Sequence, residues 1–141
     1  THMSYAAAYT GVEGLTLKYG FGDWGTQTAG GESTTMSASY AIGSFTASAS
    51  QSLSDSVAAS TDVEVTSYQV AYTVSEDISV TYGQETFDKD GSAVDEEVSG
   101  FGVSYTTGGM TISGSMINAE GGANVATADT DKWSLTAAFA F

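Results

Sequence analysis

Large apolar and aromatic residues alternate with serine, threonine, alanine and glycine along most of the chain. Between positions 15 and 24, for example, Leu15, Leu17 and Tyr19 alternate with Thr16 and Lys18. A period of two is typical of β-strands that present one apolar face. The pattern predicts nine strands, at 4–9, 15–24, 36–42, 45–50, 68–74, 78–83, 101–105, 110–116 and 133–141.

The connections between these segments alternate in length. Short stretches rich in glycine, serine and acidic residues at 11–14, 42–44, 75–77 and 107–109 predict tight turns. Longer polar stretches at 25–33, 52–62, 88–97 and 119–131 predict loops, and most acidic residues are expected in loops and turns. Short turns on one side and long loops on the other are typical of bacterial outer-membrane barrels.

The two faces of the predicted strands differ in the size of their side chains. One face carries the large residues, whereas the other is serine, threonine, alanine and glycine, with Lys18 as the one charged residue in the strands. A soluble sandwich would instead expose a charged and varied face. We therefore expect an all-β fold, an antiparallel up-and-down transmembrane β-barrel of eight or nine strands with a wet interior.

Nine strands cannot close into a barrel in which every neighbour is antiparallel, because the first and last strands run in the same direction. Small inward side chains would also leave voids in a narrow barrel. The sequence therefore predicts a piece of a larger barrel, or an assembly of several chains.

Aromatic residues gather near both ends of the predicted strands. Trp24 and Trp133 lie toward the long loops, and six aromatic residues lie toward the tight turns: Tyr9, Tyr40, Phe45, Tyr72, Tyr105 and Phe139. Aromatic girdles of this kind mark the two interfaces of a membrane. The predicted girdle residues are Tyr9, Trp24, Tyr40, Phe45, Tyr72 and Tyr105.

Composition excludes several other classes of protein. The net charge is −14 with only three lysines or arginines, which argues against binding to nucleic acid. No apolar run approaches the ~20 residues of a transmembrane helix, so a helical membrane protein is excluded. Residues 1–3 read as a cloning scar, which leaves 4–141 as one β-barrel domain.

The last predicted strand carries a recognisable ending. The sequence from Lys132 to Phe141 resembles the C-terminal β-signal of outer-membrane barrels, with Trp133, Leu135 and Phe139 at alternate positions before the terminal Phe141. Segments 67–88 and 101–116 resemble the general porins of Gram-negative bacteria, particularly those of alphaproteobacteria. The resemblance implies an outer-membrane location, lipid or lipopolysaccharide as surroundings, and insertion by the barrel assembly machinery.

General porins are similar to one another in having sixteen strands, a trimeric assembly and a constriction between facing basic and acidic side chains. The resemblance therefore implies a homotrimer. This chain departs from that pattern, because it has about half the strands, no inward arginine and no obvious long constriction loop. The constriction of the family is not carried over.

The candidate chemistry is sparse. With no cysteine, no histidine besides His2 and no G-x-S-x-G motif, we expect no enzyme and no cofactor. Carboxylates at Asp88, Asp90, Asp95 and Glu96 offer the oxygen ligands that Ca²⁺ prefers, although their spacing is not that of an EF-hand. A solvated acidic loop is the alternative interpretation.

The functional expectation is passive diffusion of small hydrophilic solutes, with a preference for cations that follows from the acidic loops. The candidate pore-lining residues are Lys18, Gln69 and Glu85, and Lys18 could instead pair with a loop carboxylate such as Glu13 or Glu85. Two alternatives stay open: a soluble lipocalin-like barrel with its large residues inward, and a structural module whose strand edges pair between chains.

Overall fold

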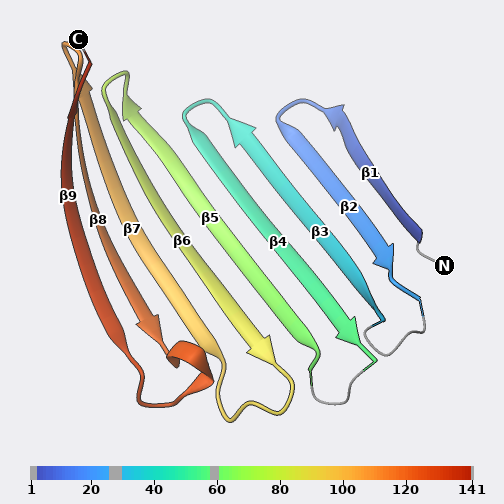
Figure 1. The fold of residues 1–141 in the computed structure, drawn as a ribbon. Helices are drawn as coiled ribbons and strands as arrows, with labels where there is room; N and C mark the ends of the chain where they lie inside the picture. Colours follow the sequence, from blue (N-terminus) through green and yellow to red (C-terminus); the bar gives the residue numbers. More distant parts are fainter. Residues whose placement is uncertain (1–2, 26–29, 58–60, 141) are drawn as a thin grey trace.

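A computed structural model describes residues 3–25, 30–57 and 61–140 and contains nine β-strands and one turn of 3₁₀-helix, η1 (Figure 1). The elements are β1 (Met3–Val12), β2 (Leu15–Asp23), β3 (Gly31–Ile42), β4 (Phe45–Ser56), β5 (Val63–Ser75), β6 (Ile78–Lys89), β7 (Glu96–Thr107), β8 (Met110–Glu120), η1 (Gly122–Asn124) and β9 (Thr130–Phe139). Within those ranges no helix is long and apolar enough to cross a membrane.

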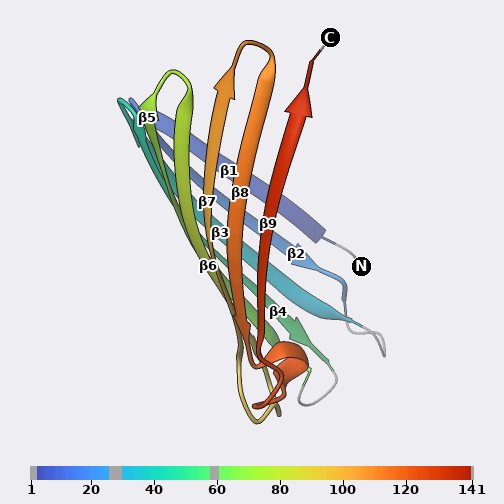
Figure 2. The same ribbon diagram turned by 90° about the vertical axis from the view of Figure 1, so that its left-hand side faces the viewer.

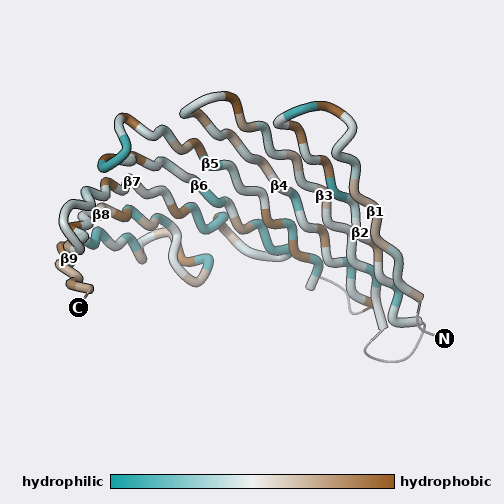
Figure 3. Tube along the Cα trace, turned by 90° about the horizontal axis from the view of Figure 1, so that it is seen from above, coloured by the Kyte–Doolittle hydropathy of each residue, from teal (hydrophilic) through white to brown (hydrophobic). Residues whose placement is uncertain are grey.

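The strands form one antiparallel sheet in the order of the sequence, each pairing with the next. The prediction of an all-β, up-and-down fold is thus confirmed. The sheet does not close, because β1 and β9 each pair with one neighbour among the described residues. Seen from above, it forms a curved wall (Figure 3). Since nine is an odd number, β1 and β9 run in the same direction.

The strands are longer than the sequence predicted, and the loops are correspondingly shorter. All four tight turns lie where they were expected, but β4 extends to Ser56 and β5 begins at Val63, inside and just beyond the predicted loop 52–62. The placement of most acidic residues in loops was therefore wrong. Polar and acidic residues continue the alternation to the strand ends, where a loop had been inferred from composition alone.

The sheet is a single layer and has no hydrophobic core: no apolar residue among those described is buried. Its accessible surface is 9513 Å² for 14.4 kDa. A folded soluble monomer of that mass exposes only about 6,800 Å². Many large apolar side chains are exposed, so one face of the sheet lacks the packing partner that a globular domain provides.

Successive hairpins are staggered along the strand direction. Phe45 at the start of β4 pairs with Tyr72, yet β5 continues beyond it to Ser75. In the same way Ile78 pairs with Tyr105, yet β7 continues to Thr107. Each tight turn therefore lies about two residues further along than the one before, a stagger of about one residue per strand. The staggered turn edge is visible along the upper side of Figure 2.

A substitution at Gly14 tests the geometry of the first tight turn. It has a φ of 75°, and a Cβ at this position would overlap the backbone carbonyl of Ala41. We expect Gly14→Ala to lower the free energy of unfolding by about 1–2 kcal/mol, because alanine is strained in the left-handed region. Urea unfolding after refolding in detergent measures this change. Gly20→Ala is the matched control, because a Cβ there meets nothing within 4 Å; an equal loss in both variants would contradict the turn argument.

Candidate functional site

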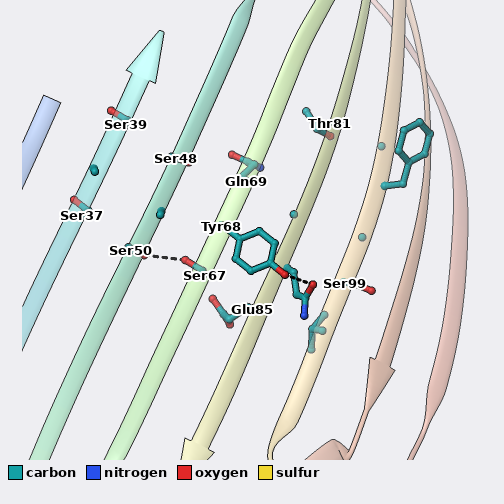
Figure 4. A pocket seen from close by; sticks show the side chains of 18 of the residues that line it. Ser37, Ser39, Ser48, Ser50, Ser67, Tyr68, Gln69, Thr81, Glu85 and Ser99 are labelled. Carbon is teal, nitrogen blue, oxygen red and sulfur yellow. Dashed lines mark hydrogen bonds between the residues drawn. The ribbon is translucent and has the colours of Figure 1, made fainter. Parts of the chain in front are cut away.

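The face with small side chains is concave and contains a hollow. This hollow has a volume of about 780 Å³ and is lined mainly by residues that share one face of β2 to β8. Figure 4 shows the serines of β3, β4 and β5 side by side on it. The polar residues of this face that Figure 4 labels are Ser37, Ser39, Ser48, Ser50, Ser67, Gln69, Thr81 and Glu85.

Hydroxyl groups on the concave face bond to one another across neighbouring strands. The Oγ atoms of Ser50 and Ser67 are 2.8 Å apart, and those of Ser115 and Ser134 are also 2.8 Å apart. Each hydroxyl keeps further donor or acceptor capacity after such a bond. The concave wall thus carries hydroxyl groups that can also bond to water.

The three predicted pore-lining residues all face this hollow, from different strands. Lys18 lies on β2, Gln69 on β5 and Glu85 on β6. Glu85 was named as a loop carboxylate, and that placement was wrong, because β6 runs to Lys89. Lys18 was also wrongly taken as the one charged residue in the strands: Glu85 and Glu96 lie on the same concave face.

The opposite, convex face carries the large residues. Five predicted girdle residues lie on it toward the tight turns and are exposed: Tyr9, Tyr40, Phe45, Tyr72 and Tyr105. Trp24 directly follows β2 at the long-loop end and is also exposed. On β9, Trp133, Leu135 and Phe139 point to the convex face, and Leu135 is 71% exposed. Phe141 lies outside the described residues.

A row of carboxylates ends the apolar surface on the long-loop side. Strand pairing places these residues on the convex face, one on each strand from β2 to β9. They are Asp23, Glu32, Asp55, Glu64, Asp88, Glu97, Glu120 and Asp131. Between this row and the tight turns, the convex positions of the described strands carry no charged residue.

This acidic row crosses the strands diagonally. Glu64 on β5 pairs with Leu53, two residues before the β4 carboxylate Asp55, so the row moves by two residues between these strands. The row moves by two residues again from β6 to β7, where Glu97 pairs with Thr86 and not with Asp88. It moves by two residues a third time from β8 to β9, where Asp131 pairs with Asn118 and not with Glu120. From Asp23 to Asp131 the row moves by six residues over the seven spacings between β2 and β9, which at ~3.3 Å per residue and ~4.8 Å between strands corresponds to an angle of roughly 30°. The tight turns are staggered in the same direction.

Two amide side chains next to the acidic row each donate to one of its carboxylates. The Nε2 of Gln51 donates to Oε1 of Glu64 at 2.6 Å, and the Nδ2 of Asn118 donates to Oδ1 of Asp131 at 2.9 Å. The hydroxyl of Tyr68 donates to Oε1 of Gln84. A narrow polar belt thus separates the apolar surface from the long loops.

The candidate calcium ligands do not lie on one surface. Asp88 is on the convex face, where it is repelled by Asp95, Glu64 and Asp90. Glu96 points to the concave face instead, and its Oε2 accepts a hydrogen bond from the backbone N–H of Ala123 at 3.0 Å. Across residues 3–25, 30–57 and 61–140 no group of three or more acidic, histidine or cysteine side chains is arranged around a metal position. Calcium binding at the acidic loops stays a prediction.

Comparisons with protein families, with curated proteins and with solved structures found no match to this chain. Its function is therefore argued from the two faces and from the boundary between them.

Sequence reasoning found the apolar face and the polar wall, but it missed the acidic row. The signal was present, because each of these carboxylates continues the period-two alternation of its strand. A row across strands becomes visible only when the register is known. Glu96 as a partner of the loop 121–129 had no sequence signal at all.

Proposed function

We propose that this chain forms part of the wall of a passive diffusion channel in a bacterial outer membrane, a porin or a piece of one. The convex face lies against lipid, and the concave hydroxyl face lines a water-filled path for small hydrophilic solutes. Lipopolysaccharide, the barrel assembly machinery and a trimeric state are further predictions of this proposal.

The diagonal acidic row is the observation that carries the proposal. A membrane surface is flat, so on strands tilted by 35–45° the boundary between apolar and charged residues must cross them at that angle. The row from Asp23 to Asp131 crosses the strands at roughly 30°, close to that range. A sheet packed against a second protein layer would need no boundary of charged residues that crosses eight strands at an angle.

The position of the large side chains argues against the lipocalin-like alternative. A barrel that binds an apolar ligand needs an apolar interior, whereas here the concave side carries serines, glycines and Gln69. The large residues lie on the opposite face.

The open edges support the third interpretation as a second candidate. β1 and β9 each have an unpaired side among the described residues, and unpaired edges favour strand pairing between molecules. Because these two strands run in the same direction, identical chains joined edge to edge around a ring would meet in parallel. Antiparallel closure requires an odd number of additional strands between β9 and β1, which favours a piece of a larger barrel.

Charge substitutions on one strand test whether the convex face lies in lipid. Val103 and Glu97 both point outward from β7, with Val103 six positions beyond the acidic row. In lipid vesicles we expect Val103→Arg to lower the free energy of unfolding by about 2–4 kcal/mol and Glu97→Arg by at most ~1 kcal/mol. Urea unfolding of the refolded, vesicle-bound protein provides both values.

A convex face in water would give a different result for the same two substitutions. Val103 is 41% exposed in the isolated sheet. If this face were in water, arginine there would change stability by only about 0.5 kcal/mol, as most surface substitutions do. Similar small effects at both positions would exclude a lipid-facing convex surface.

Ion selectivity tests the concave face. We expect channels containing this wall to prefer cations at low salt, and Glu85→Gln to reduce that preference because Glu85 faces the hollow. Reversal potentials in planar bilayers under a salt gradient measure the preference. Glu97→Gln removes the same charge from the convex face and should have a smaller effect. An equal effect of both substitutions, or a preference for anions, would contradict the proposed lining.

A further inference from the structure

The loop between β8 and β9, residues 121–129, is a folded unit. The N–H of Gly122 donates to the carbonyl of Ala128 at 3.0 Å, and the N–H of Ala128 donates to the carbonyl of Val125 at 3.0 Å. Gly121 is buried, and its N–H donates to Oδ1 of Asp129 at 3.2 Å. Backbone bonds across its base give this loop a defined shape.

The loop reaches past its own two strands and contacts β7. Oε2 of Glu96, the first residue of β7, accepts the N–H of Ala123 at 3.0 Å. The amide of Asn124 donates to the carbonyl of Val94 at 3.3 Å, in the neighbouring loop. A charged acceptor makes the first of these the stronger bond. Two loops that are separate in sequence are thereby joined at one end of the wall (Figure 2).

The direction of Glu96 places this contact on the concave side. Its strand partner is Phe87, and with Glu85, Phe87 and Val98 it lines a hollow of about 250 Å³ on the concave face. The adjacent Glu97 points the opposite way, into the convex acidic row. The loop is thus held toward the side that the proposed function assigns to water.

Ala123 and Asn124, the loop residues that bond to Glu96 and Val94, have backbone angles that are unusual for residues other than glycine. Ala123 and Asn124 have φ values of 56° and 57°, in the left-handed region that residues other than glycine rarely adopt. Such angles persist where surrounding contacts impose them. The backbone N–H of Ala123 donates to Glu96, and the side-chain amide of Asn124 donates to the carbonyl of Val94.

We propose that loop 121–129 forms a fixed narrowing at the long-loop mouth of the channel, anchored by Glu96, and that it limits the size of the solutes that pass. This inference rests on the proposed function. Apart from Asp129, the loop consists of small and uncharged residues. The carboxylate of Glu96 is engaged with the backbone. The narrowing therefore limits hydrophilic solutes, such as saccharides, by their size.

The anchor is tested first without reference to transport. We expect amide hydrogen exchange at Ala123, measured by NMR on protein refolded in detergent micelles, to become about tenfold faster in Glu96→Ala. Glu96→Gln keeps an acceptor oxygen without the charge, so its exchange should be accelerated less than in Glu96→Ala. Glu97→Ala, which removes the neighbouring carboxylate on the other face, should leave the exchange unchanged. Unchanged exchange in Glu96→Ala, or equal acceleration in Glu97→Ala, overturns the anchor.

Solute size is tested in liposomes that contain the protein, by the rate of swelling in neutral saccharides of increasing size. We expect Glu96→Ala to admit larger saccharides than the wild type, while Glu96→Gln and Glu97→Ala keep the wild-type size limit. Faster amide exchange at Ala123 in Glu96→Ala together with an unchanged saccharide size limit would overturn the proposal that the loop narrows the channel. If Gln and Ala at position 96 changed permeation alike, Glu96 would act through its charge and the anchor would be excluded. Liposomes in which no variant admits any saccharide would reject both the channel and its narrowing, while the exchange experiment would still decide the anchor.

Discussion

Backbone hydrogen bonds between neighbouring strands hold this sheet together without a hydrophobic core. Every strand from β2 to β8 pairs on both sides, and the pairing is antiparallel throughout. Because successive side chains alternate between the two faces, the register of this ladder decides which residues share a surface. A slip by one residue in a single strand would place serines among the aromatics and break both faces. The concave wall, the convex apolar surface and the acidic row all depend on this register.

The stagger of the ladder connects the local geometry with the proposed location in a membrane. Hairpins that advance by two residues each give strands that are tilted against any line joining equivalent turns. The acidic row and the turn edge follow the same tilt, so the apolar surface between them is a band of similar height on neighbouring strands. A band with parallel edges is the shape that a flat hydrocarbon layer requires. The open edges of β1 and β9 fit a wall that further strands complete.

The sequence alone predicted nine strands and four tight turns, because period-two alternation and glycine-rich turns are local signals. It made the strands too short at their long-loop ends, since carboxylates such as Asp55 and Glu120 are uncommon in strands and were taken as parts of loops. The diagonal row could not be predicted, because sliding one strand by two residues keeps every side chain on its face and leaves the local pattern unchanged. Glu96 and Ala123 are 27 positions apart and meet only through the fold of a loop.

Depth measurements in a bilayer test the membrane plane most directly. The chain has no cysteine, so single cysteines carrying a spin label can be introduced without background. Ala38 and Asp131 lie in one row of the ladder, reached through the pairs from β3 to β9. We expect labels replacing Glu32, Glu97 and Asp131 to lie at one depth near the membrane surface. A label replacing Ala38 should lie roughly 15 Å deeper. Equal depths at Ala38 and Asp131, or four labels equally accessible to water, would contradict the account.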